Sequence, residues 1–446
     1  MRYNKIFAVL IFLYIIFYAG LSHARIYIDI GPPRIIPFPI AISRFNVFEN
    51  PNYALDTDNI RLALEAEKIL LKDLKLTGFL EIFSFEDFPK NVRESFSIDK
   101  EQNINFDFWN EHPAEALVLG SAFTEDGEKI TVQFRLYDLI RKESLTGLRF
   151  RGHMNDLYQI IHNIADEIIF HITGIKGVFQ TKLCFCTTKS GNKEICSIDF
   201  DGRNWTSITQ NGSINLSPSW SPDSTKISFT SYMKRNPDLY VLTLSDQSTQ
   251  KISSKEGLNA GASWSPDGKS MAVMMRDGDY TKIFLMNQDG SHPTILTTKS
   301  GNEASPTWSP DGKSIALVSD RSGTPQIYIV DLDTRKMHRL TYEGTYNVSP
   351  SWSPNGERIA YSSMEENFNI FTINIEGNII WQLTDKERNN EDPTWSPDGR
   401  FIAFTSDRTG RKHIYVMNTN GSNQRQLTFS HKEEMAPDWS SYLNSK

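Results

Sequence analysis

The chain has 446 residues, 39% of them hydrophobic and 23% charged, a composition typical of globular proteins with a substantial core. Its 47 basic and 54 acidic residues give a net charge of −7. A general nucleic-acid binder needs an excess of basic residues for phosphate contacts, so the charge argues against that class. The length accommodates two or three domains.

Residues 1–24 have the layout of a secretory signal peptide. Arg2 and Lys5 precede an apolar run from Ile6 to Ala19, and the tripeptide SHA at 22–24 places small residues at the −3 and −1 positions of a cleavage site. The alternative is an uncleaved anchor, but the run is short beside the roughly 20 apolar residues of a spanning helix. We therefore expect cleavage, export, and no membrane span in the mature protein.

Residues 25–45, RIYIDIGPPRIIPFPIAISRF, form an extended N-terminal segment. Arg25–Ile30 has strand character, and a free strand of this kind can add to the edge of a partner's sheet or pack on its own domain. The sequence leaves both outcomes open. Proline neither continues a helix nor donates to a sheet ladder, so we expect no regular element in the stretch that follows. Four prolines lie there: Pro32, Pro33, Pro37 and Pro39.

Residues 46–174 are predicted to form a small α/β domain. Asp56–Lys75 carries apolar residues at helical spacing behind an acidic cap, and Phe79–Phe83 is typical of a strand. The runs EALVLGSAF and EKITVQFRLYD flank Glu125–Gly127, which predicts a hairpin. A second helix is expected from 155 to about 172. Three histidines nine residues apart spread around a helix axis, so we expect structural or solvated roles for them: His153, His162 and His171.

The rest of the chain repeats one phrase, WSPDG or a close variant. The intervals between the tryptophans that introduce it are 43 or 44 residues, which indicates a structural repeat. The tryptophans are Trp220, Trp264, Trp308, Trp352, Trp395 and Trp439. Alternating runs such as Ser314–Ser319 and Ile327–Leu332 follow each phrase, separated by turns rich in Gly, Asn and Asp. Four short antiparallel strands per unit are typical of a β-propeller blade.

Counting the units predicts how the ring closes. Lys182–Thr187 has strand character but no Trp strand before it, and Trp439 has no blade after it. We therefore expect residues 177–446 to form six blades, the C-terminal strand completing the first and leaving no long open edge. The repeated Trp, Pro and Gly are expected to be scaffold, because they pack between blades and supply turn geometry.

The loops that lead from the outer strand of one blade to the inner strand of the next open on one face. Binding residues favour loops on a rigid frame, so we expect a partner-binding face here; the alternative is a set of solvated loops. The loops are rich in Asn and acidic residues and poor in apolar ones: Asn211–Pro218, Lys255–Ala262, Ser300–Pro306, Glu343–Pro350, Lys386–Pro393 and His431–Pro437.

Three cysteines lie close together in sequence. Their odd number and spacing match neither a disulfide framework nor a zinc site. A local link from Cys184 or Cys186 to Cys196 stays open, and buried free thiols are the preferred interpretation.

An exported propeller enzyme, peptidase-like or a lyase, is the alternative function. Propellers with WSPDG repeats gate serine peptidases of the prolyl oligopeptidase type, but no G-x-S-x-G nucleophile motif occurs here. The nine histidines are scattered, only His431 lies in a face loop, and neither H-E-x-x-H nor a Gly-rich phosphate loop is present. We expect no catalytic residue, metal ligand or cofactor.

The order of signal peptide, extended strand, small α/β domain and six WSPDG blades resembles the TolB family of the Tol–Pal envelope system of Gram-negative bacteria. The resemblance implies a non-enzymatic periplasmic adaptor that supports outer-membrane integrity and envelope constriction at division. It implies binding of the peptidoglycan-associated lipoprotein Pal by the propeller face and of TolA by the mature N-terminus, with other outer-membrane proteins as further partners.

The same resemblance assigns site residues. The Pal-binding face would comprise Asn259, Gly261, Asn302, Glu303, Ala304, Asn347, Asn389, Asn390 and Glu391. The strand that reaches TolA would comprise Arg25, Ile26, Tyr27, Ile28, Asp29 and Ile30.

Overall fold

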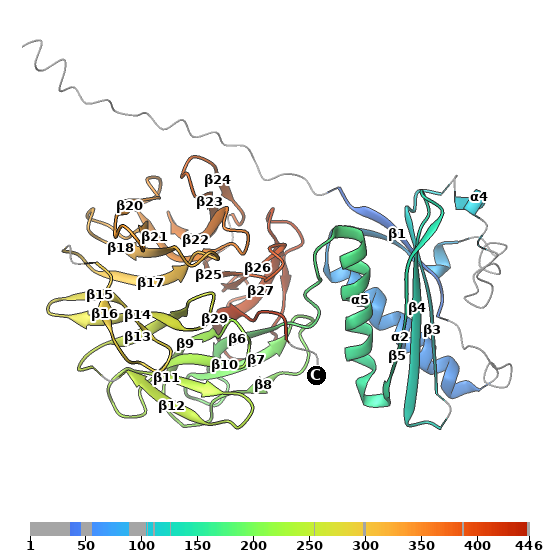
Figure 1. Cartoon of the computed structure of the whole chain (residues 1–446), viewed down its shortest axis with the longest axis horizontal. Coiled ribbons are helices and arrows are strands. Elements are labelled where there is room, and N and C mark those ends of the chain that lie inside the picture. Colours follow the sequence, from blue (N-terminus) through green and yellow to red (C-terminus); the bar gives the residue numbers. More distant parts are fainter. Residues whose placement is uncertain are drawn as a thin grey trace, which may run out of the picture.

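The computed structural model describes residues 36–45, 56–88, 104, 106–109, 112–124, 126–253, 255–297, 300–385 and 388–443. Figure 1 shows an α/β domain beside a ring of small sheets, which confirms the expected fold class. The expected signal peptide and the strand Arg25–Ile30 lie outside the described residues. Within the described ranges no helix is both long enough and apolar enough to cross a bilayer.

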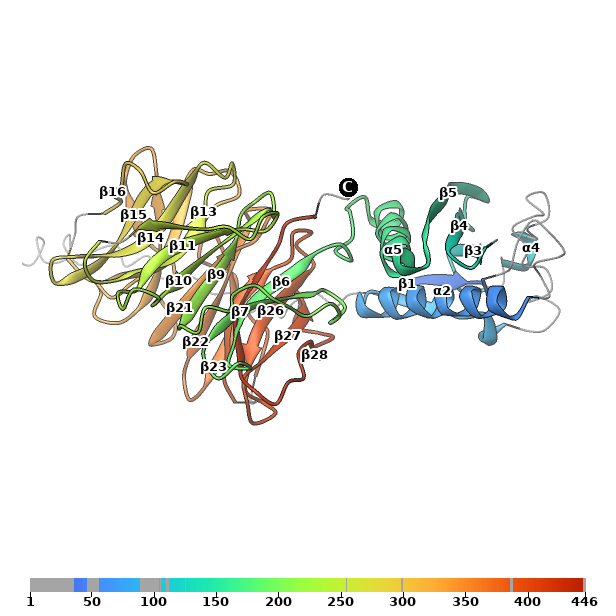
Figure 2. The ribbon, with the colours of Figure 1, turned by 90° about the horizontal axis from the view of Figure 1, so that it is seen from below.

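The α/β domain is built on one five-stranded sheet with the strand order β2-β1-β3-β4-β5. Its strands are β1 Phe38–Ile42, β2 Leu80–Phe83, β3 Ala116–Thr124, β4 Lys129–Asp138 and β5 Glu143–His153. Helices α2 (Thr57–Leu76) and α5 (Leu157–Thr173) pack on one face of the sheet (Figure 2). The short elements are η1 Phe85–Asp87, α4 Phe106–Trp109 and η2 Met154–Asp156.

Helix α2 begins and ends close to where its sequence signals lie. Asp56 is the N-cap, and its side chain accepts the backbone N–H of Asp58 at 3.0 Å. Of the expected apolar positions, Ala63 and Leu74 are buried, whereas Ile60 and Leu64 are exposed. The buried stripe therefore lies slightly further round the helix than the sequence predicted.

Strand β1 corrects the expectation that the prolines prevent a regular strand. Phe38–Ile42 includes Pro39 and pairs in parallel with both β2 and β3. The backbone N–H of Phe38 donates toward β2, so the nitrogen of Pro39 faces the other neighbour. Pairing with β3 begins only at Ile40, so the missing N–H of Pro39 costs the ladder no hydrogen bond.

Six four-stranded sheets form the propeller, numbered here as blades in the order of their inner strands. Blade 1 is β9 Asn215–Trp220, β10 Lys226–Ser231, β11 Asp238–Thr243 and β12 Thr249–Ser253. Blade 2 is β13 Asn259–Trp264, β14 Ser270–Asp277, β15 Tyr280–Asn287 and β16 Thr294–Ile295. Blade 3 is β17 Glu303–Trp308, β18 Ser314–Ser319, β19 Gln326–Asp331 and β20 Met337–Arg339.

Blades 4 and 5 repeat the arrangement, and blade 6 closes the ring. Blade 4 is β21 Tyr346–Trp352, β22 Arg358–Met364, β23 Phe368–Asn374 and β24 Ile380–Gln382. Blade 5 is β25 Asn390–Trp395, β26 Phe401–Ser406, β27 His413–Asn418 and β28 Arg425–Gln426. Blade 6 combines the last strand with the first three: β29 Glu434–Trp439, β6 Lys182–Thr187, β7 Glu194–Asp199 and β8 Thr206–Ser207. This closure is the one that the tryptophan count predicted.

The repeated phrase is scaffold, as expected. The Nε1–H groups of Trp264, Trp308 and Trp395 donate to backbone oxygens on the inner strand of the preceding blade, at 3.1–3.3 Å. The turns also meet between blades: a Cβ on Gly356 would lie 3.3 Å from Pro310 of the preceding phrase. Gly356 has φ 79°, which favours glycine. Cys184, Cys186 and Cys196 are free and buried.

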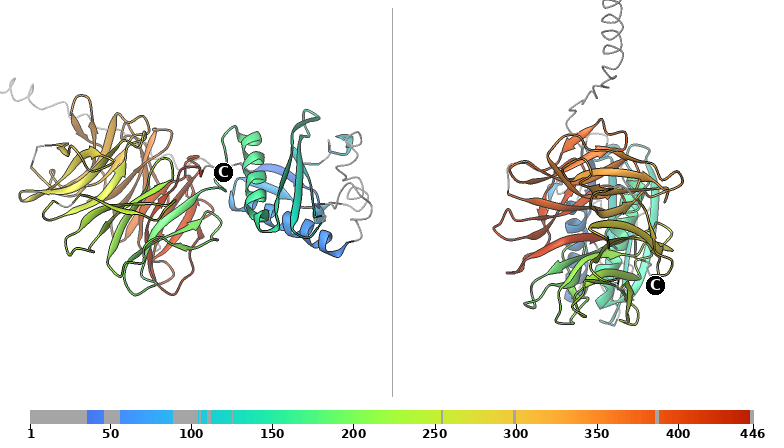
Figure 3. Two further views of the ribbon diagram at one scale, coloured as in Figure 1. Left: turned by 60° about the horizontal axis from the view of Figure 1, so that its bottom comes forward. Right: turned by 90° about the vertical axis from the view of Figure 1, so that its left-hand side faces the viewer.

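The two domains meet where α2 and α5 lie beside blades 5 and 6 (Figures 1 and 3). His162 of α5 bonds Asp73 of α2 through Nδ1 at 2.7 Å, and its Nε2 lies 3.9 Å from Asp201 of the β7–β8 turn. Burial alone lowers the pKa of His162, but Asp73, with Asp201 and Asp199, outweighs burial and raises that pKa above 6.5. His162, whose protonated form these carboxylates favour, therefore bridges the two domains.

We expect His162→Gln to lower the free energy of unfolding more at pH 6 than at pH 9. A raised folded-state pKa gives stability that is fully present below 6.5 and is lost as the pH rises through the folded-state value. Urea unfolding at the two pH values measures the difference. His171→Gln on the same helix is the control, because the contacts of His171 with Glu167 and Phe170 lie within α5. An equal loss at both pH values would contradict the bridge.

Candidate partner-binding face

Each inner strand contains a β-bulge at the same place. The pairing register shifts there in all six blades, for example between Ala260 and Ser263. The bulged residue has φ between 48° and 59°, a conformation that bends the strand and redirects its side chains. The six bulged residues are Ser217, Gly261, Ser305, Ser349, Asp392 and Ala436.

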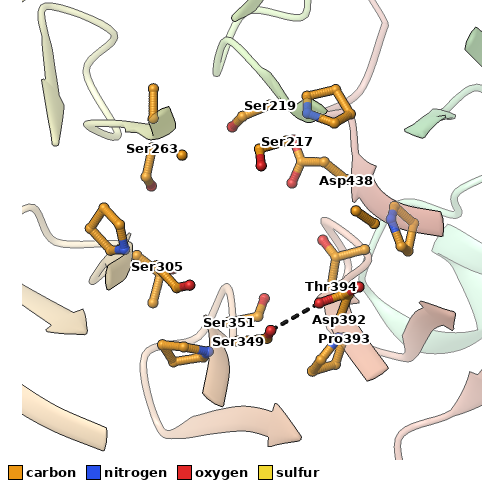
Figure 4. A pocket seen from close by; sticks show the side chains of 18 residues that line it. Ser217, Ser219, Ser263, Ser305, Ser349, Ser351, Asp392, Pro393, Thr394 and Asp438 are labelled. Atoms are coloured by element: carbon orange, nitrogen blue, oxygen red, sulfur yellow. Dashed lines mark hydrogen bonds between the residues drawn. The ribbon is translucent and has the colours of Figure 1, made fainter. Parts of the chain in front are cut away.

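The bulges line a central channel. It encloses about 210 Å³ and is bounded by three consecutive residues from each inner strand, 18 in all (Figure 4). Sixteen of them are Ser, Thr, Pro, Ala or Gly, and the two exceptions are Asp392 and Asp438. Figure 4 shows both carboxylates on the same side of the channel. The channel is therefore small-walled, polar and locally acidic.

Asp438 is held in a position that a hydroxyl residue occupies in the other blades. Its Oδ2 accepts the backbone N–H of Trp220 at 2.7 Å, a role that Thr307 Oγ1 plays for Trp352 at 3.4 Å. Burial raises the pKa of Asp438 to about 7, against the hydrogen bonds it accepts. Burial likewise raises the pKa of Asp392, which accepts Ser349 Oγ at 2.9 Å.

Every inner strand has a buried polar residue at its start, in the first position of five strands and in the second position of β21. All six are at most 1% exposed: Asn215, Asn259, Glu303, Asn347, Asn390 and Glu434. In five blades the side chain contacts a polar residue 21 positions earlier, at the start of the third strand of the preceding blade. These contacts tie neighbouring blades together beneath the loops.

The chemistry of each contact is matched. Glu303 contacts Lys282 Nζ at 3.4 Å, and Glu434 bonds His413 Nδ1 at 2.9 Å. Where the later residue is Asn215, the earlier one is Glu194, and Nδ2 donates to its carboxylate at 2.8 Å. In these three contacts an acid on one strand meets a base or an amide on the other. The remaining two join amides, Asn347 to Gln326 and Asn390 to Asn369, so each buried polar group has a hydrogen-bonding or ionic partner. The variation between repeats at these positions is structural.

The nine residues predicted for the face therefore differ in burial and in what they contact. Four are buried at the starts of inner strands: Asn259, Glu303, Asn347 and Asn390. Gly261 lines the channel. Asn302 and Asn389 hold the loops in shape: Asn302 Nδ2 donates to Asp320 at 2.8 Å, and Asn389 Nδ2 donates to Asp407 at 3.1 Å.

A pocket of about 400 Å³ brings Asn302, Ala304 and Glu391 together on this face. It spans blades 3, 4 and 5. Two aromatic residues that sequence reasoning did not single out also line it, Tyr346 and Phe368, whose rings stand edge to face with centroids 6.0 Å apart. Tyr346 lies inside the loop Glu343–Pro350 that the sequence identified, and an aromatic residue within a largely polar loop was the sequence signal available there.

The pocket combines apolar walls with negative charge. Val348 and Pro325 add to the aromatic pair, and Asp320, Glu391 and Asp392 supply carboxylates. Glu391 is also paired with Lys412 Nζ at 2.8 Å. A concave apolar site with a few polar groups that fix orientation is suited to an anchoring side chain of a partner. The geometry supports recognition of an apolar or cationic side chain.

Comparisons with known proteins give one family across both domains. A family model described as the TolB amino-terminal domain matches residues 26–145, and one described as the TolB beta propeller domain matches 170–370 and 349–444. The Tol-Pal system protein TolB of Geobacter sulfurreducens is 37% identical over 178 residues, 39% of each chain. That of Desulfosudis oleivorans is 33% identical over 200 residues, 44% of this chain and 43% of its own.

A solved structure matches over nearly the full length. The crystal structure of TolB from Acinetobacter baumannii superposes with a TM-score of 0.78 and 25% identity, covering 93% of this chain and 99% of that one. The sequence alignments are shorter than this structural match. In them the chain spans about two fifths of the length of the curated relatives it matches.

Proposed function

Because the chain belongs to the TolB family, we propose that it is a non-enzymatic periplasmic adaptor of the Tol–Pal system. It binds the lipoprotein Pal with the propeller face that carries the outer-to-inner loops, and TolA with residues 25–30 of the mature chain. Through these contacts it supports outer-membrane integrity and envelope constriction during division.

The single observation that carries the Pal assignment is the pocket of about 400 Å³ formed by loops of blades 3, 4 and 5. It opens beside the channel, since both are lined by Ser305, Ser349 and Asp392. Aromatic residues at the centre of a concave surface are the usual anchors of protein–protein affinity. The carboxylates around Tyr346 and Phe368 select a partner that presents a basic or apolar side chain.

The proposal refines the set of residues that contact Pal. Asn259, Glu303, Asn347 and Asn390 shape the loops from below, and replacing any of them disturbs the fold before it disturbs binding. The contact residues proposed here are Asn302, Ala304, Tyr346, Phe368 and Glu391. Gly261 and Asn389 flank them.

We expect Tyr346→Ala to weaken binding of a soluble Pal domain from the same organism by about tenfold or more. The substitution removes a partly exposed aromatic side chain that lines the pocket and is proposed to contact the partner. Calorimetric titration of the mature protein measures the change. Tyr232→Ala is the matched control, since both tyrosines are 36% exposed and Tyr232 lies on blade 1 across the channel. The control is expected to bind as the wild type does.

Equal loss in both variants would contradict the location of the site. Absence of binding by the intact protein would overturn the adaptor function and favour the exported propeller enzyme, to be sought with a substrate screen.

A further inference from the structure

The outer edge of β5 is an unpaired sheet edge of unusual length. β5 runs from Glu143 to His153 and ends the sheet order, so no other strand within the described residues pairs with it. Figure 2 shows it as the strand farthest from α2. An edge of this length offers a row of backbone donors and acceptors to an incoming strand. Seven of its 11 residues are exposed, so the strand is also accessible.

The two faces of β5 differ in chemistry. Phe150 pairs with Val132 and Leu148 with Phe134, so these two side chains lie on the apolar face that the helices cover. Leu148 is nevertheless 39% exposed at the rim. Arg149 pairs with Gln133 and Arg151 with Thr131, which puts both arginines on the opposite face. Along the edge, apolar and cationic side chains therefore alternate.

The cationic face is concave and strongly basic. A hollow of about 580 Å³ is lined by Lys129, Arg149, Arg151 and His153, together with Phe123 and Thr131. Arg149 Nε donates to Gln133 Oε1 at 2.9 Å, which orients its guanidinium. Asp126 also lines the hollow, but its Oδ1 accepts the backbone N–H groups of Glu128 and Lys129 in its own turn. This basic patch stands out on a chain whose net charge is −7.

We propose that the edge of β5 binds an extended, acidic segment of a partner protein as a sixth strand of the sheet. Backbone hydrogen bonds to β5 give the affinity. The alternation of cationic and apolar side chains along β5 gives the selectivity for the sequence of the bound segment. Every second residue of the segment is acidic and meets Arg149 and Arg151, while the residues between are apolar and cover Leu148 and Phe150. Arginine favours this pairing because its planar guanidinium bonds a carboxylate with two donors.

This interaction lies apart from both contacts proposed above. It uses neither the propeller face nor residues 25–30, so its success or failure is independent of Pal and TolA binding. It would let the α/β domain hold a third protein while the propeller is occupied.

The test uses the full mature chain and a fluorescent peptide of about nine residues that alternates Glu and Val, long enough to span most of β5. We expect saturable binding by anisotropy, and slowed hydrogen exchange of β5 amides in the complex. The same peptide with Lys in place of Glu is expected not to bind. Arg149→Glu with Arg151→Glu should weaken binding of the acidic peptide at least about tenfold and create binding of the Lys peptide.

Two controls separate charge pairing from folding and from general electrostatics. Arg149→Gln with Arg151→Gln keeps the side chains polar and should weaken binding without changing the melting temperature. Arg61→Glu with Lys68→Glu makes the same charge change on the exposed side of α2, and it should leave binding unchanged.

Three outcomes would overturn the proposal. If the acidic peptide binds without slowing exchange in β5, strand addition is excluded. If phosphatidylglycerol vesicles bind in an Arg149- and Arg151-dependent way while the peptide does not, the patch recognises a membrane surface. If the wild type binds no peptide while the Arg149→Glu, Arg151→Glu variant self-associates, the arginines serve only to keep the edge from pairing with other strands.

Discussion

Replacing Glu303 by Ala is expected to destabilise the protein by about 3–5 kcal/mol, because it leaves a buried cation without its anion. Glu303 is fully buried, and the side chain of Lys282 is only 4% exposed. Arg321 and the hydroxyl of Thr297 also bond the same carboxylate. Urea unfolding at pH 7 measures the loss.

Blade 5 supplies the matched rescue for this substitution. There Asn390 takes the place of Glu303, Asn369 that of Lys282 and Arg408 that of Arg321. Lys282→Asn combined with Glu303→Asn rebuilds this pair of amides beside an arginine between blades 2 and 3. We expect the free energy of unfolding of the double variant to return to within about 1 kcal/mol of the wild-type value. This requires a coupling free energy between positions 282 and 303 larger than the one between sites that are far apart. If the stability losses of the two single substitutions simply add in the double variant, the pairing of Lys282 with Glu303 is contradicted.

Replacing Asp438 by Asn is expected to stabilise the protein at alkaline pH by as much as about 4 kcal/mol. Burial raises the pKa of Asp438 from 3.8 to about 7. The folded state therefore holds a proton that the unfolded state releases, and stability falls as the pH rises from about 4 through 7. Asparagine removes this dependence while its side-chain oxygen still accepts the N–H of Trp220.

The measurement compares urea midpoints of wild type and variant at pH 4 and pH 8. The two should agree closely at pH 4 and separate at pH 8. Asp438→Thr serves as a second variant, because Thr394 and Thr307 occupy the same position in blades 5 and 3. A constant difference across the pH range would show that the carboxyl is not protonated in the folded state.

The repeat made the propeller predictable because each blade needs the same few residues. Trp395 and its equivalents must reach the preceding blade, and the Pro and Gly of each turn must meet their neighbours, so the phrase recurs at a fixed interval. The missing Trp strand before Lys182, together with the Trp439 strand that begins no blade of its own, predicted closure by β29.

The α/β domain was predicted less completely. Pro39 argued against β1, and only the staggered start of β3 explains why a proline is tolerated there. No strand was predicted for β5, because its alternation of apolar and cationic residues covers only Leu148–Arg151 and a glycine lies on either side, Gly147 and Gly152. Glycine is depleted in strands, and an alternating run of four residues between two glycines is a weak strand signal.

The sequence predicted a face and nine residues on it, and the structure buries four of those nine. Loop residues are usually exposed, yet Asn259 and Glu303 are the first residues of strands and point inward. A sequence signal for this existed. Glu303 and Glu434 each follow a basic residue, Lys282 or His413, by 21 positions, whereas Asn215 follows Glu194. Such compensation within a repeat marks buried partners, not a binding surface.

Hydrogen exchange of the mature protein, with and without a soluble Pal domain, locates the surface that the partner covers. We expect slowed exchange in the loops around the pocket, at 302–305, 346–349 and 389–392, and no change in the turns of the repeated phrase. Protection confined to those turns or to the α/β domain would contradict this expectation, because the partner would then bind elsewhere.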